Sequence, residues 1–193
     1  MAKERKFLQK FMIYFIAFIM IASTIGFMYG SDTVNANTVV KESGYKFVRK
    51  GAFWSTFIDK KEALFSRLPS EVSSVSMPAG VADKLKGTLE IDFTYDINDT
   101  NSKEIAEAFY YLGKSLNFNF NKYARAGLTE NSTFNVPIIT CEDATAAVPV
   151  MLFRAGNGTR IFVEGECIIG EGEQYAFHAI KDRILYEMFG ILK

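Results

Sequence analysis

The longest apolar pattern in the chain is an uncharged run from Phe11 to Ser31. Apolar side chains would cover all sides of a helix built from this run, and Ser23 and Thr24 add only small hydroxyls that can bond to their own helix backbone. At about 1.5 Å per residue, a helix over residues 11–30 is about 30 Å long, which matches the hydrocarbon core of a bilayer. The pattern therefore predicts a transmembrane helix over residues 11–30, in contact with membrane lipid.

The charges beside this run predict its orientation. Residues 1–10 carry four bases and one acid, whereas residues 31–40 carry one acid and no base. By the positive-inside rule, residues 1–10 form a basic cytoplasmic N-terminus and the C-terminal domain lies outside the cell membrane. The alternative is a cleaved signal peptide, with Val34-Asn35-Ala36 as its cleavage site. The run is longer than a usual signal core of about 7 to 15 residues, so we favour the retained single-pass anchor.

After the anchor, the patterning changes twice before residue 88. Residues 31–43 are small and polar and are expected to form a tether. Residues 44–68 alternate aromatic or apolar side chains with polar ones, which predicts a small β-meander. Residues 69–87 are rich in serine and contain two prolines, so a linker or loop is expected. The expected strands of the meander cover residues 44–51, 52–58 and 61–66.

The rest of the chain, residues 88–193, has the clearest periodicities. Residues 89–98 alternate apolar and polar without a break, which predicts a strand with one packed and one wet face. Helical spacing predicts one helix that begins at Asn101 or Ser102 and ends at Gly127, and a last helix over about residues 173–189. Further strands are expected over residues 135–141, 147–154, 160–164 and 166–169, with a hairpin turn at 156–158.

This order of elements predicts the fold class. A strand, a helix, several strands and a final helix are typical of an α+β domain. We therefore expect an N-terminal transmembrane helix, a small β-meander, and then an exported α+β domain in which two helices cover a mostly antiparallel sheet.

Charge narrows the range of partners. The whole chain is neutral, but without its first 30 residues it carries 18 basic and 21 acidic residues. A domain with a net charge of about −3 lacks the basic stripe that phosphate neutralisation needs, so no nucleic acid partner is expected. Apolar residues make up 49% of the chain, enough for a domain to bury a core without metals.

Cys141 and Cys167 are the only cysteines. Outside the cytoplasm such a pair is first interpreted as a disulfide, and adjacent strands would bring the two residues together. The alternative is a pair of buried free thiols that behave as small apolar side chains. A catalytic thiol is not favoured, because neither cysteine has a CxxC partner and the chain has one histidine, His178, to activate it.

No motif points to catalysis, a metal or a cofactor. The sequence has no Gly-rich phosphate loop, GxSxG elbow, HExxH helix or CxxC pair. On the last expected helix, His178 is followed one turn later by Asp182, which allows an imidazole–carboxylate pair, but no nucleophile accompanies them. We therefore assign no catalytic, cofactor-binding or metal-binding residue.

Three glycosylation sequons lie on the expected outer side of the membrane. Each falls at an expected strand end, loop or hairpin turn, which are exposed positions. The alternative is that they are ordinary surface asparagines in turns. The candidate acceptors are Asn98, Asn131 and Asn157.

Three stretches form a combined pattern that spans most of the chain. They are Ser23-Thr24-Ile25-Gly26-Phe27 at the end of the anchor, Gly44-Tyr45-Lys46-Phe47 with Trp54 in the meander, and a tail from Thr159-Arg160-Ile161 through Glu166-Cys167-Ile168-Ile169 to Phe189-Gly190-Ile191. In this combination the chain resembles uncharacterised archaeal single-span membrane-anchored proteins. The resemblance implies an archaeal envelope setting and brings no activity, substrate or site residue.

Together these patterns predict a non-enzymatic single-pass membrane protein. Its extracytoplasmic domain is expected to bind a membrane or envelope protein, as an accessory or assembly subunit of an envelope complex. One alternative is an extracytoplasmic enzyme, such as a thiol/disulfide enzyme in which Cys141 and Cys167 cycle between thiol and disulfide. Another alternative is a surface-filament subunit that polymerises through strand edges.

Overall fold

The computed structural model describes Met12, residues 14–21 and residues 38–192, in a chain that divides into two units, Met1–Thr38 and Val39–Lys193. In the first unit Met12 and residues 14–21 are helical and their side chains are exposed. Tyr14 and Met20, for example, are 74% and 67% exposed.

Most of the expected N-terminal organisation falls outside these residues. The basic N-terminus over 1–10, most of the membrane helix over 11–30 and the first part of the tether are not among the described positions. Within the part of the chain that the structure describes, no helix combines the length and hydropathy needed to cross a bilayer.

The second unit begins with sheet A, four antiparallel strands that follow one another in chain order. Two-residue turns at Ser43-Gly44 and Asp59-Lys60 have positive φ at all four residues, which matches the twist of hairpin strands. The predicted meander is present, but the expected tether over residues 31–43 is wrong at its end, because residues 39–42 pair with the next strand. The strands are β1 (Val39–Glu42), β2 (Tyr45–Lys50), β3 (Phe53–Ile58) and β4 (Lys61–Phe65).

The linker expected over residues 69–87 contains two short helices instead, α2 (Pro69–Val72) and α3 (Val81–Gly87). Val72 and Leu85 are fully buried in the main core. The serines that suggest a loop are exposed, whereas the apolar side chains between them are buried.

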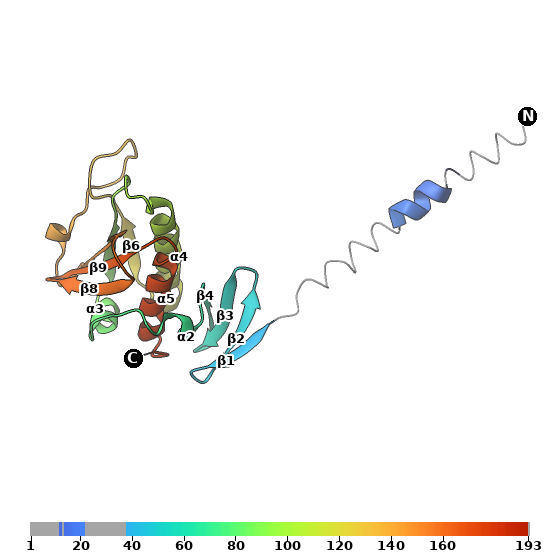
Figure 1. The fold of residues 1–193 in the computed structure, drawn as a ribbon, viewed down its shortest axis with the longest axis horizontal. Coiled ribbons are helices and arrows are strands. Elements are labelled where there is room, and N and C mark those ends of the chain that lie inside the picture. The colour runs from blue at the N-terminus through green and yellow to red at the C-terminus, as the bar shows by residue number, and fades with distance from the viewer. Residues whose placement is uncertain (1–11, 13, 22–37, 193) are drawn as a thin grey trace, which may run out of the picture. The chain divides into compact units, whose positions relative to one another are not determined.

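The remaining strands form sheet B, in the order β6-β5-β7-β9-β8; Figure 1 labels β6, β8 and β9 of this sheet. Three of its four pairings are parallel, and only β8 runs antiparallel, to β9. The α+β class is confirmed, but the expectation of a mostly antiparallel sheet is wrong for this part of the chain. The strands are β5 (Glu90–Thr94), β6 (Tyr123–Ala126), β7 (Val150–Ala155), β8 (Arg160–Glu164) and β9 (Cys167–Gly172).

β5 and β6 pair in parallel because α4 (Ser102–Phe120) connects them. As in a βαβ unit, this helix carries the chain back to the end of the sheet at which β5 began. Parallel strands are usually buried on both faces. Asp92 in the middle of β5 is only 1% exposed, although the alternation of residues 89–98 predicts that it faces water. The expected wet face is therefore wrong.

Two long helices, α4 and α5 (Phe177–Met188), lie between the two sheets (Figure 1). Towards sheet B, Phe109 of α4 stacks on Phe93, with 4.6 Å between ring centroids. Towards sheet A, Tyr186 of α5 stacks on Phe65 at 4.1 Å. One core therefore joins both sheets through the helices.

The two helices differ in how well the sequence predicts their ends. α5 stops before Gly190, as expected, where φ is positive. α4 ends at Phe120 rather than at Gly127, because Asn121 adopts the left-handed conformation with φ 54°. Tyr123, which continues the helical spacing of apolar residues, instead begins β6.

Candidate functional site

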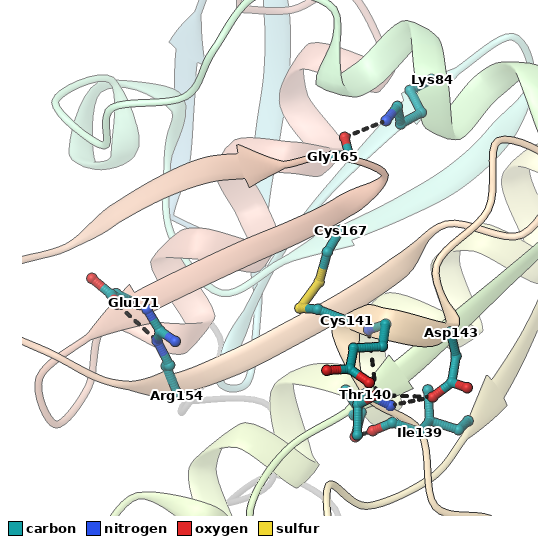
Figure 2. The surroundings of a disulfide bond; sticks show 11 residues. Lys84, Ile139, Thr140, Cys141, Asp143, Arg154, Gly165, Cys167 and Glu171 are labelled. Atoms are coloured by element: carbon teal, nitrogen blue, oxygen red, sulfur yellow. Dashed lines mark hydrogen bonds and ion pairs between the residues drawn. A yellow bond between two sulfur atoms is a disulfide. The ribbon is translucent and has the colours of Figure 1, made fainter.

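A disulfide joins Cys141 and Cys167, with 5.2 Å between their Cα atoms (Figure 2). Cys167 is the first residue of β9 and is fully buried. Cys141 begins a short 3-10 helix, η1 (Cys141–Asp143), in which the Asp143 carboxylate accepts hydrogen bonds from the backbone and the hydroxyl of Thr140. The disulfide expected from the cysteine pair is present, but Cys141 does not end a strand.

The disulfide ties the segment of residues 129–148 to the face of sheet B opposite the helices, and Ile139 is the one buried side chain of this segment. Ile139, Val150, Cys167 and Ile169 form a second small core on this face. The buried Thr94 hydroxyl also donates to the carbonyl of Ile139 at 2.7 Å. Residues 135–141, expected to form a strand, contribute one isolated bridge to Leu128 instead.

The same segment exposes three apolar side chains, which we call the apolar row: Phe134, Val136 and Ile138. They are 61%, 42% and 49% exposed. The backbone beside them is fixed, because the Leu128 N–H donates to Pro137 O at 3.0 Å and the Ile139 N–H donates to Leu128 O at 2.9 Å. Apolar side chains that are both clustered and exposed are typical of interaction sites.

On the same face of sheet B, Glu171 holds two arginines. The Arg154 guanidinium donates to Glu171 Oε1 at 2.5 and 2.8 Å, and that of Arg160 donates to Oε2 at 2.6 and 2.9 Å. Figure 2 shows the first of these pairs. Burial alone would raise the pKa of Glu171, but the hydrogen bonds from Arg160 and Arg154 outweigh it and lower the pKa below its usual value.

This lowered pKa predicts a pH-dependent contribution to stability. The Glu171 ion pairs stabilise the fold at a pH above the ordinary pKa of 4.5, and the contribution is lost as pH falls through the lower pKa of the folded state. We therefore expect Glu171→Gln to be destabilising at about pH 7 and to approach the wild type below about pH 4. Urea unfolding across this range measures the difference. Glu164→Gln, at an exposed position of β8, is the control, and a Glu171→Gln deficit that stays constant with pH would contradict the prediction.

All three candidate glycosylation sites are exposed. The amide of Asn98 donates to Glu130 Oε1 at 2.6 Å, so a glycan on this nitrogen would have to replace that hydrogen bond. Asn131 lies in the segment that the disulfide holds, and Asn157 lies in the turn between β7 and β8. Glycosylation at the three positions stays a prediction.

The structure does not pair His178 with Asp182, a contact that the helical spacing only allowed. His178 Nε2 lies 3.9 Å from Glu107 Oε2, and its Nδ1 lies 3.5 Å from Ser66 Oγ. A distance of 3.5 Å is too long for the strong hydrogen bond that activates a serine nucleophile. The Asp182 carboxylate instead accepts hydrogen bonds from Lys181 and from the backbone amides of Ser66 and Arg67.

Asp182 and its neighbour Lys181 form a buried charged pair that sequence reasoning missed. Their side chains are 0% and 1% exposed, and the Lys181 ammonium donates to Asp182 Oδ1. Asp182 Oδ2 accepts from the backbone N–H groups of Ser66 and Arg67, both at 2.8 Å. Burial raises the pKa of Asp182, against the opposing effect of Lys181 and the two amides. The sequence signal is a run of three charges, Lys181-Asp182-Arg183, between apolar positions of the helix.

Lys181 also reaches a pocket of about 250 Å³ between sheet A and α4. Its apolar walls are Phe53 and Leu64 from sheet A and Tyr111 and Phe118 from α4. The rings of Phe53 and Tyr111 lie 4.9 Å apart and connect the two sides. The polar lining residues besides Lys181 are Glu62, Lys114, Ser115 and Asn119.

Among the described side chains, no three His, Cys, Asp or Glu groups are placed to hold a metal ion. Comparison of the chain with protein-family models, curated proteins and solved structures gives no match.

Proposed function

We propose that the chain is a single-pass membrane protein whose exported domain binds a partner protein of the cell envelope through the apolar row. The observation that carries the proposal is the exposure of Phe134, Val136 and Ile138 on a segment that the disulfide holds in place. A preorganised segment loses little conformational entropy when it binds, which favours recognition over catalysis as its role.

The disulfide also supports export. Disulfides persist in oxidising compartments and are rare in the cytoplasm. The uncharged run after the basic N-terminus supplies a route to the outside and a retained anchor. The exposed side chains of residues 14–21 are all apolar or aromatic, and lipid is a suitable solvent for such a surface.

The charges near the apolar row favour a protein partner over a lipid surface. Glu130, Glu142 and Asp143 lie in or beside the same segment, and the first of these is held by Asn98. Anionic headgroups attract basic residues and repel acidic ones. A protein with an apolar groove and a basic rim fits this surface better than an anionic lipid surface does.

Site-specific photo-crosslinking in native membranes tests the partner proposal. We expect a crosslinker at position 134 of the full chain to capture one envelope protein, and a crosslinker at position 110 to capture none. Tyr110 is a matched control, because it is 64% exposed on α4, outside the segment. The triple change Phe134→Ser, Val136→Thr and Ile138→Thr should abolish the crosslinked species from a further position, Asn131, without unfolding the domain.

Two outcomes would count against the proposal. Equal crosslinking from positions 134 and 110 would show unspecific contact, and capture of the same partner by the triple variant would remove the apolar row from the interface. Mass spectrometry of the mature N-terminus tests the anchor separately. An N-terminus that begins at Asn37 would show a cleaved signal peptide instead.

A further inference from the structure

We propose that the pocket between sheet A and α4 binds a small amphipathic carboxylic acid, with an aromatic body, one carboxylate and one hydrogen-bond donor. The site is separate from the apolar row, and its argument depends neither on the membrane anchor nor on the partner protein. At about 250 Å³ the pocket is smaller than typical sites for drug-sized ligands, which begin near about 300 Å³. It therefore suits a ligand of roughly ten heavy atoms.

The carboxylate is inferred from the buried ammonium of Lys181. An ammonium has three N–H donors, and the hydrogen bonds of the described residues supply Lys181 Nζ with one acceptor, Asp182 Oδ1. The other oxygen of Asp182 is engaged by two backbone amides. A buried charge with unused donors costs free energy, and an anionic oxygen in the pocket would remove that cost.

The other charges at the pocket are compatible with an anion. Lys114 is exposed at the rim. Glu62 is the one acidic lining residue, and its Oε1 atom already accepts hydrogen bonds from Lys50 at 2.7 Å and from the Ser55 hydroxyl at 2.5 Å. Lys181 and Lys114 are therefore the two cations of the lining that can meet an anionic ligand.

The hydrogen-bond donor of the ligand is inferred from Asn119. Its Oδ1 atom is buried and has no partner among the described residues, while its Nδ2 donates to Ser115 Oγ at 3.2 Å. Most buried polar atoms in proteins have a partner. A hydroxyl on the ligand would supply one.

The aromatic body follows from the pocket walls. Phe53 and Tyr111 already contact each other in a tilted arrangement, and Phe118 adds a third ring at 59% exposure. Aromatic rings pack with one another in tilted or stacked pairs and gain free energy beyond the area that they bury. The walls therefore favour a ring over a linear chain.

Calorimetric titration of the purified full chain with three matched probes tests the site. They are 4-hydroxyphenylacetate, phenylacetate, which lacks the hydroxyl, and 4-hydroxyphenylethanol, which lacks the carboxylate. We expect the first to bind best, the second to bind about threefold more weakly, and the third about tenfold more weakly. Absence of binding by 4-hydroxyphenylacetate up to about 10 mM would overturn the proposal, as would equal binding of the acid and the alcohol.

Variants then locate the binding. The double change Lys181→Met and Asp182→Asn removes both buried charges while keeping an oxygen for the amides of Ser66 and Arg67, so we expect it to fold and to lose about tenfold in affinity for the acid. Lys114→Gln should lower the affinity for the acid by about twofold to fivefold, because the charge that it removes is exposed. Lys103→Gln, at an exposed position of the same helix, should leave the affinity unchanged. A folded double variant with unchanged affinity would place the binding elsewhere, and so would an equal loss in Lys103→Gln.

Discussion

Replacing both Cys141 and Cys167 by alanine is expected to lower the free energy of unfolding by about 4 kcal/mol. The two cysteines are 26 positions apart, and closing a loop of this length accounts for about 3.5 kcal/mol in the chain-entropy model. The buried Cys167 also contributes to the small core with Val150 and Ile169, so its loss adds to the effect. Urea unfolding of the full chain measures the difference.

Reduction of the wild-type protein is the control for this prediction, since it breaks the bond without removing the side chains. We expect the reduced protein to lie between the oxidised wild type and the double variant. Because Cys167 is fully buried, we also expect the disulfide to stay oxidised in a glutathione buffer, with a potential below about −300 mV. A bond that cycles at a higher potential would instead favour the thiol/disulfide enzyme, and no change in stability on reduction would contradict a structural role.

Asp182→Ala is expected to destabilise the domain by about 3 to 5 kcal/mol. The change leaves the ammonium of Lys181 buried without its partner, and it leaves the amides of Ser66 and Arg67 without an acceptor. A protein loses far more stability when one member of a buried ion pair is removed than when both members are replaced. Thermal and urea unfolding of the full chain measure the loss.

Three variants test whether the loss of the buried charge pair, and not aspartate substitution in general, lowers the stability. Asp83→Ala removes a carboxylate whose side chain is 86% exposed on α3 and should change stability by less than about 0.5 kcal/mol. Asp182→Asn keeps an oxygen acceptor and should cost less than Asp182→Ala. The double change Lys181→Met and Asp182→Asn should recover part of the loss. If the double variant is less stable than Asp182→Ala, charge pairing is not the cause.

Elements defined by local pattern were predictable from the sequence. β8 occupies the expected residues 160–164, and the turn at 156–158 separates β7 from β8 as expected. The end of α5 follows from Gly190, which is suited to the left-handed conformation. In each case neighbouring residues in the sequence carry the whole signal.

Features that depend on distant segments were not predictable. The polar positions of β5 suggest a solvated face, but Arg125 of the neighbouring β6 binds Asp92 with two hydrogen bonds, which lets a carboxylate occupy a covered face. Parallel pairing was missed for the same reason, because a period of two does not specify the direction of the neighbouring strand.

The candidate site shows the same limit. The cysteine pair could be inferred because two cysteines in an exported chain have one natural partner each. The Lys181–Asp182 pair could not, because the two backbone amides that donate to Asp182 belong to Ser66 and Arg67 in the distant turn after β4, and no sequence motif marks them. The pocket is assembled from sheet A and two helices, so none of its walls is complete in any one stretch of sequence.

Asp182 lies 116 positions after Ser66 in the sequence, and its carboxylate accepts a hydrogen bond from the Ser66 backbone N–H. During synthesis the segment after β4 therefore has no acceptor until almost the whole domain has been made. Contacts this distant in sequence close slowly, because the chain must lose loop entropy before they form. The native hydrogen bonds from Ser66 and Arg67 to Asp182 can consequently form only after α5 has been synthesised.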